Sequence, residues 1–208
     1  MNGLRRRHVA SLMGAALWAR TANARDQAVT PASASAASGQ ADDTVRRGRT
    51  LAFPRDHGAH AGSATEWWYA TGWAGPAEAP TLGFQITFFR SRTGLATRLP
   101  GRLAPRQLLF AHAAFTDLVQ GRHVHADRLQ RWNGQATPGA AVGARADDAQ
   151  VWIGPWALQR RGDTWQARVA DDDWQLELEL QRQQPLLLQG DAGFSRKGPD
   201  ERQASHYY

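Results

Sequence analysis

Residues 53–60 and 66–73 are the part of this chain that is richest in groups able to do chemistry. The first range reads Phe-Pro-Arg-Asp-His-Gly-Ala-His, and the second reads Glu-Trp-Trp-Tyr-Ala-Thr-Gly-Trp. A carboxylic acid that apolar neighbours keep neutral can protonate a carbon atom, and aromatic faces can stabilise the cation that forms. Glu66, beside Trp67 and Trp68, has these surroundings and is the first candidate for a catalytic acid.

The titratable groups of this stretch also have purely structural interpretations. Glu66 lies at the expected start of a strand, where a carboxylate often pairs with an arginine such as Arg90. Asp56 and His57 lie in a loop, and loops commonly hold acid and base groups that relay a proton or position water. The same two residues could instead form a turn that hydrogen-bonds its own backbone. His60 is a weaker candidate of the same kind.

Four further polar residues could contact a ligand or a metal ion. His123 and His125 would point to one face of a strand, which suits two metal ligands. No third ligand follows at a suitable spacing, so an exposed polar strand face is the better interpretation and no metal is predicted. His112 would share a strand face with Phe110, either as a core histidine or as a ligand contact. Gln85 would face away from its apolar neighbours, either into a cavity or toward solvent.

Short segments of alternating character must position these groups. Residues 174–181 alternate apolar and polar side chains with a strict period of two, which predicts a half-buried strand. Tight turns are expected at residues 161–163 and 171–173. Eight short strands without a convincing long helix predict an all-β fold, either an antiparallel barrel or a sandwich. The other seven strands are expected at about residues 66–73, 82–90, 108–118, 122–129, 150–160, 163–170 and 185–189.

Nine tryptophans are the strongest anomaly of the composition. Large aromatic surfaces serve both cores and apolar pockets. We expect Trp67, Trp73 and Trp174 to include core positions, which leaves one or two rings for a ligand. If residues 66–73 are extended, Glu66 and Trp68 share one face of the strand and Trp67 shares the other with Tyr69, Thr71 and Trp73, and one of these faces should line a cavity.

The two ends of the chain differ in character from its main part. Three arginines at 5–7, an apolar run to Trp18 and the sequence Ala22-Asn-Ala24 predict an export signal over residues 1–24. A small-residue stretch predicts a flexible linker over residues 25–50. One domain is then expected over residues 51–208, in the periplasm or outside the cell.

Charge and cysteine content exclude several classes of protein. The formal charge is +6, but residues 51–208 hold 17 basic and 16 acidic side chains, so we expect no nucleic-acid partner. The chain has no cysteine, and therefore neither a disulfide nor a lipid anchor on cysteine is possible. No apolar run reaches the ~20 residues that a spanning helix needs.

Several motifs in order resemble one known family. The ranges 53–60 and 66–73, followed by residues 83–90, 189–193 and 206–208, are similar to the AttH/carotenoid 1,2-hydratase family of secreted lipocalin-like proteins over about residues 49–208. The resemblance implies a lipocalin-like barrel rather than a sandwich. Family members typically have two such domains, so it also implies a missing second domain or self-association. Some members hydrate a C=C bond of a carotenoid or related isoprenoid, and many are described as secreted hydrolases.

The sequence thus predicts a lipocalin-like domain that binds an apolar isoprenoid or lipid-like molecule and contributes to hydration without a cofactor. A non-catalytic module that binds an apolar ligand is the alternative. A part of a hydrolase is a further one, although no Gly-x-Ser-x-Gly elbow is present. The expected catalytic residues are Glu66, Asp56 and His57, and the expected ligand-binding residues are Trp67, Trp68, Tyr69, Gln85 and His112.

Overall fold

The computed structural model describes residues 8–10, 45–94, 105–200 and 202–208. The expected export signal lies outside the described residues except for His8–Ala10, and the expected linker lies outside them except for residues 45–50. Within the described ranges, no helix has the length and apolar character needed to cross a membrane.

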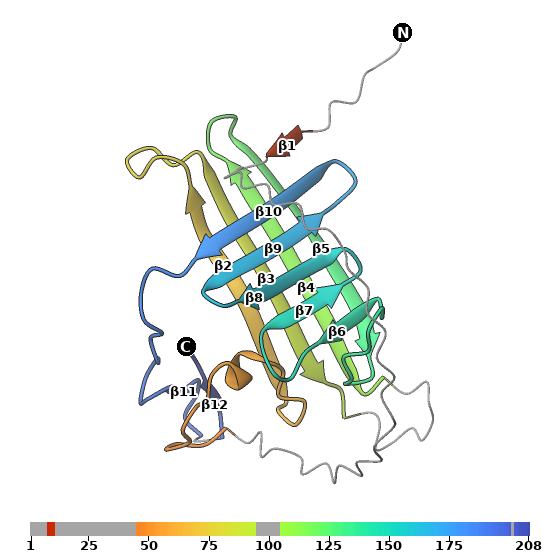
Figure 1. The fold of residues 1–208 in the computed structure, drawn as a ribbon, viewed down its shortest axis with the longest axis vertical. Helices are drawn as coiled ribbons and strands as arrows, with labels where there is room; N and C mark the ends of the chain where they lie inside the picture. The colour runs from red at the N-terminus through yellow and green to blue at the C-terminus, as the bar shows by residue number, and fades with distance from the viewer. Residues whose placement is uncertain (1–7, 11–44, 95–104, 201) are drawn as a thin grey trace, which may run out of the picture.

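Two β-sheets dominate the structure (Figure 1). One has four antiparallel strands in the order β2-β3-β4-β5, and the other has the order β1-β10-β9-β8-β7-β6, in which only the β1–β10 pair is parallel. A 3-10 turn, η1 (Arg55–His57), and a small hairpin of β11 (Phe194–Arg196) and β12 (Ala204–His206) complete the fold. The remaining strands are β1 (His8–Ala10), β2 (Thr65–Ala74), β3 (Leu82–Arg92), β4 (Gln107–Asp117), β5 (Arg122–Trp132), β6 (Val142–Ala144), β7 (Gln150–Ile153), β8 (Trp156–Arg161), β9 (Thr164–Ala170) and β10 (Trp174–Gln181).

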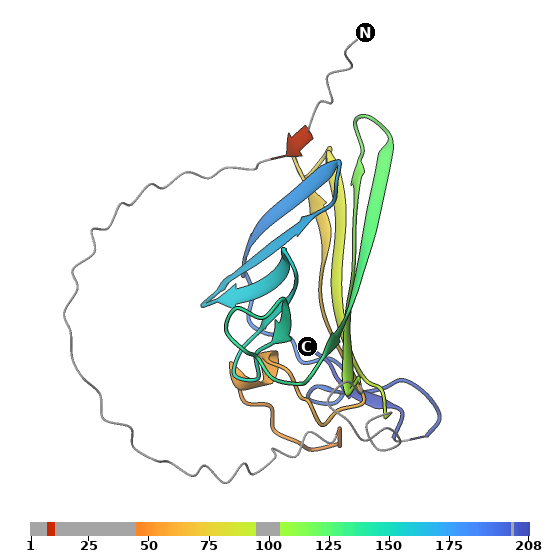
Figure 2. The same cartoon turned by 90° about the vertical axis from the view of Figure 1, so that its right-hand side faces the viewer.

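The sheets form two layers whose strands cross (Figures 1 and 2). Strands β5 and β4 contact β6 and β7, so the layers meet along that side. The expected all-β, antiparallel fold is confirmed. Among the described residues the two ladders stay separate and are not closed into a barrel by a shared strand pair. Strand β2 is therefore terminal in its sheet, and η1 and the β11–β12 hairpin lie near the end where β2 begins.

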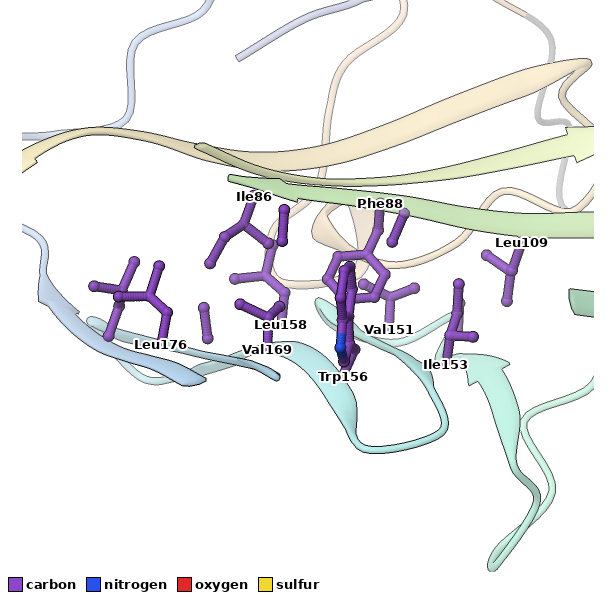
Figure 3. Close-up of a cluster of buried hydrophobic side chains, with 14 of the residues drawn as sticks. Ile86, Phe88, Leu109, Val151, Ile153, Trp156, Leu158, Val169 and Leu176 are labelled. Atoms are coloured by element: carbon purple, nitrogen blue, oxygen red, sulfur yellow. The ribbon is translucent and has the colours of Figure 1, made fainter. Parts of the chain in front are cut away.

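Alternating side chains from both sheets fill the space between the layers (Figure 3). Ile86 and Phe88 of β3 face Leu158 and Val169 of the other sheet, and all four are almost completely buried. Trp156 is fully buried, and its indole Nε1 donates to the Ala170 carbonyl over 2.6 Å, which satisfies the one polar atom that its ring takes out of water. This core holds β2 and β3 rigidly enough to position polar groups on them.

Two strand predictions are wrong. Residues 150–160 form two strands, because Gly154 takes a positive φ of 58° and lets β7 and β8 pair as a tight hairpin. Residues 185–189 form no strand. Leu187 in this segment is 68% exposed, so its apolar character does not mark a buried strand.

The tryptophans divide between core and surface. Trp174 is buried, as expected. Trp73 is 69% exposed, which contradicts the expected core position, because its strand face points away from the second sheet. Trp67 lies half-buried on that same outer face and contacts Tyr207, with ring centroids 6.4 Å apart.

Candidate functional site

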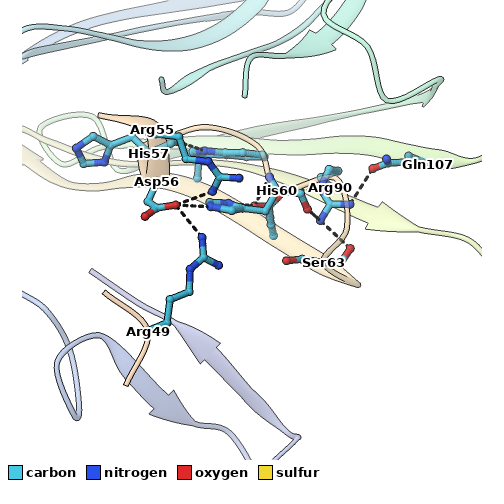
Figure 4. A network of polar contacts seen from close by, with 10 residues as sticks. Arg49, Arg55, Asp56, His57, His60, Ser63, Arg90 and Gln107 are labelled. Atoms are coloured by element: carbon cyan, nitrogen blue, oxygen red, sulfur yellow. Dashed lines mark hydrogen bonds and ion pairs between the residues drawn. The ribbon is translucent and has the colours of Figure 1, made fainter. Parts of the chain in front are cut away.

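Asp56 is the buried centre of the turn η1. Its Oδ2 accepts a hydrogen bond from the Ala52 N–H over 2.6 Å, while Oδ1 accepts from Arg55 at 2.6 Å and Arg49 at 3.0 Å (Figure 4). Burial alone would raise the pKa of Asp56, but its hydrogen bonds, that from His60 first, outweigh burial and lower the pKa to about 2. Asp56 is therefore a carboxylate over the whole physiological range.

His60 connects Asp56 to Glu66 on β2. Its Nε2 lies 2.9 Å from Asp56 Oδ1, and its Nδ1 lies 2.6 Å from Glu66 Oε1. Burial disfavours the charged ring, but the hydrogen bond to Glu66 and the charge of that carboxylate outweigh it and raise the pKa of His60 above its usual 6.5. A ring with a carboxylate at each nitrogen is best satisfied as the doubly protonated cation.

Arg90 holds Glu66 from the neighbouring strand. The two residues are directly opposite in the β2–β3 ladder, and Arg90 Nε donates to Glu66 Oε2 over 2.5 Å. The remaining donors of this fully buried guanidinium reach Gln107 Oε1 and the carbonyls of His60 and Ser63 (Figure 4). The ion pair with Arg90 is the structural alternative that the sequence had left open for Glu66.

His57 has surroundings opposite to those of His60. Its ring lies among aromatic rings, with centroid distances of 4.5 Å to Phe53, 5.6 Å to Trp165 and 5.5 Å to Tyr208. Burial, followed by the charge of Arg160, lowers the pKa of His57 below 6.5. At neutral pH His57 is therefore an uncharged ring that can accept or donate one hydrogen bond.

A groove of about 1110 Å³ runs along β2 and is lined from both faces of that strand, from the facing sheet and from the C-terminal segment. Its apolar wall comes from Trp68 on β2 and from Leu158, Trp165 and Leu180 on β8, β9 and β10. The indole Nε1 of Trp68 donates to the His57 carbonyl over 2.9 Å, which fixes this ring at the wall. Of the residues predicted for catalysis or binding, the groove is lined by Glu66, His57, Trp67, Trp68 and Tyr69, while Asp56 lies behind it and reaches it through His60.

The other predicted residues lie on the outer face of the four-stranded sheet. Gln85 lines a shallower hollow of about 590 Å³ with Tyr69 and Phe89. His112 shares this face with Phe110, as predicted, but lies outside both hollows and pairs with the exposed Asp127. His123 and His125 stack there with ring centroids 6.1 Å apart, and no group of three metal-ligating side chains occurs among the described residues.

Sequence reasoning missed several residues of this site. Trp165 is one of nine tryptophans, and nothing in its sequence neighbours distinguishes it from the other eight. Only knowing which strand face each ring occupies could have identified it as a residue of the groove. Arg49 and Gln107 carry no local signal, because they reach the cluster only through the fold. Tyr208, whose burial raises the pKa of its phenol, was visible only as the end of the His-Tyr-Tyr motif.

Comparison with known proteins relates the chain to a family and to solved structures. The family model described as AttH-like matches residues 44–208. A crystal structure of a candidate AttH protein from Nitrosomonas europaea is 39% identical in sequence, with a TM-score of 0.64. The match covers 78% of this chain and 47% of that one, so this chain spans about half the length of its solved relative. No curated protein matches the chain.

Proposed function

Since this chain belongs to the AttH-like family, we propose that its groove binds one long apolar molecule of the isoprenoid or lipid-like class. The observation that supports this proposal most directly is the apolar wall of Trp68, Leu158, Trp165 and Leu180 in a groove of about 1110 Å³. Ligand sites commonly combine an apolar wall with polar groups that orient the ligand, and His57 and Glu66 are two of the polar groups that line this groove.

Burial supplies the affinity. An isoprenoid that removes a few hundred Å² of apolar surface from water gains several kcal/mol at about 25 cal/mol per Å². Ordering and association costs offset part of this gain, so a dissociation constant of the order of micromolar is expected.

Tryptophan fluorescence tests the proposal. Polyprenyl or carotenoid analogues should quench the emission saturably, and Trp165→Ala should weaken the binding because its ring lies on the wall. Trp73→Ala is the matched control, since Trp73 is 69% exposed on the outer face. Quenching that never saturates, or that a sugar reproduces equally well, would reject an apolar groove.

Hydration of a C=C bond is the second candidate function, because Glu66 and His57 both line the groove beside Trp68. In such a step one carbon receives a proton, water adds to the other carbon, and the added water gives up a proton to a base. The neutral ring of His57 could position the water and accept that proton. Both oxygens of Glu66 already accept hydrogen bonds, so a proton on Glu66 must displace a donor before it reaches a ligand.

The test for hydration is incubation with a polyprenyl alkene in water labelled with oxygen-18. Incorporation of the label into the product, and its loss in His57→Phe, would support catalysis. Saturable binding without labelled product would leave the binding function alone.

Export and a second partner domain remain part of the proposal. The basic residues at 5–7 followed by Ala22-Asn-Ala24 support export, and mass spectrometry of the mature N-terminus, expected near Arg25, tests it. Because the match covers 47% of the solved relative, the proposed partner is a further domain or a second copy of this chain. Exposed Trp73 and Leu129 on the outer face offer apolar surface for either.

A further inference from the structure

We infer that the groove takes a single-chain amphiphile with an anionic head, an inference that rests on the proposed binding function. The inference is based on the charge of the side chains that line the groove. Besides its apolar part, the groove is lined by Arg49, Arg92, Arg182, Lys197 and Arg202, and among the described residues Glu66 is the one acidic side chain of the lining.

This positive charge is local. Residues 51–208 have nearly equal numbers of basic and acidic side chains, so a random patch of surface would hold both signs. The carboxylate of Glu66 does not neutralise the wall, because Arg90 and His60 already bind it from behind. The guanidinium of Arg49 is compensated by a buried carboxylate, since it pairs with Asp56 over 3.0 Å.

The other four cations, Arg92, Arg182, Lys197 and Arg202, are exposed to solvent, so a ligand can reach them. No carboxylate of the described residues pairs with Arg92, and Lys197 lies over the Tyr207 ring, 4.7 Å from its centroid. Arg182 and Arg202 pair with aspartates, but their side chains are 47% and 90% exposed, and such exposed pairs are weak.

Three of the exposed cations, Arg92, Lys197 and Arg202, lie toward one part of the groove. The Arg92 N–H donates to the Ala64 carbonyl over 2.8 Å, which places Arg92 beside the start of β2. Lys197 and Arg202 belong to the hairpin segment that Figures 1 and 2 place near this same end. An apolar chain along Trp68 and Trp165 would therefore bring its head among positive charges. A carboxylate or phosphate head gains from them, whereas a neutral head does not.

The test compares ligands that share one chain and differ in the head. Oleate, oleyl phosphate and oleyl alcohol are titrated as monomers, below their micellar concentrations, with tryptophan emission as the readout. Both anions should bind about tenfold more tightly than the alcohol at low salt, and the preference should shrink as salt rises.

The double variant Arg92→Gln/Lys197→Gln should reduce the preference for oleate over oleyl alcohol to about one. Arg161→Gln is the matched control, because this exposed arginine lies outside the groove and should keep the preference. Thermal melts of both variants confirm that they are folded.

Each outcome separates the two proposals. Equal binding of oleate and oleyl alcohol would overturn the anionic head and leave the apolar groove intact. Binding of none of the three ligands would overturn the proposed function itself. If phosphatidylglycerol vesicles compete with the ligands and hold the protein while monomeric oleate does not bind, the positive charges serve a membrane surface and the inference fails.

Discussion

Glu66 and Arg90 face each other across the β2–β3 ladder, and their ion pair of 2.5 Å leaves the guanidinium no exposed surface. Glu66→Gln should therefore leave a buried cation without its compensating charge. Breaking a buried pair in this way costs about 3 kcal/mol. Urea unfolding of the variant should show this loss, and an unchanged free energy of unfolding would contradict an anchoring role.

The pair Glu177 and Arg168 is the matched control for this measurement. It also joins neighbouring strands, at 3.1 Å, but its side chains are 52% and 63% exposed. Glu177→Gln should change the free energy of unfolding by less than about 0.5 kcal/mol. Adding Arg90→Met to Glu66→Gln should recover part of the lost stability, because the uncompensated charge is then removed.

Asp56 should make the free energy of unfolding fall at acidic pH. Its pKa is lowered in the folded state, to about 2 from a usual value of 3.8, so the ionised form favours folding. This contribution is present above about pH 4 and is lost as pH falls through about 2. Asp56→Asn should flatten the part of the stability profile between these values, as unfolding at a series of pH values would measure. A wild-type profile without this fall in stability at acidic pH would contradict the burial and hydrogen bonding described for Asp56.

The pKa values of His57 and His60 should be shifted in opposite directions from 6.5. The pKa of His60 is raised by Glu66, so its contribution to stability is present below pH 6.5 and is lost as pH rises through the folded value. The pKa of His57 is lowered by burial, so its contribution is present above pH 6.5 and is lost as pH falls. NMR titration of the two rings should place them on opposite sides of 6.5. Two pKa values on the same side of 6.5 would refute the contrast between His60, which lies between two carboxylates, and His57, which lies among aromatic rings.

Gly58 should be difficult to replace. A Cβ there would lie 2.6 Å from the backbone carbon and oxygen of Ala146, which cannot move aside as a side chain could. Gly58→Ala should cost about 1–3 kcal/mol and disturb the adjacent turn that holds Asp56. Gly83→Ala is the control, because its Cβ would meet only Thr116 Cβ at 4.0 Å and its stability should barely change. Equal melting temperatures for the two variants would show that residues 145–146 are not rigid.

Periodicity predicted those strands that have one buried face. Residues 174–181 form β10 over the predicted range, because each inward side chain meets the core while its neighbours face water. The single strand predicted at residues 150–160 is wrong, because a tight turn separates two strands that have the same alternating pattern. The strand predicted at residues 185–189 is absent, because apolar side chains alone do not supply a neighbouring strand with which to pair.

The sequence predicted where the candidate site lies better than it predicted the contacts within the site. The sequence identified Asp56, His57 and Glu66 as one group, and two of them line one groove. It could not tell that His60 binds both carboxylates, because that contact depends on how the turn η1 folds back on β2. Nor could it find the basic side chains of the groove, which are far apart in the chain and come together only through the fold.

Strand β2 is the last strand of its sheet, and among the described residues no strand pairs with its outer edge. Backbone N–H and C=O groups along such an edge can template the addition of another chain, above all where uncharged residues of high β-propensity follow one another, as they do at Trp67, Trp68 and Tyr69. Occupation of the groove beside this edge would shield it. If the groove holds a ligand as proposed, the same opening is where the empty protein is exposed to aggregation, and a bound ligand would protect the protein against it.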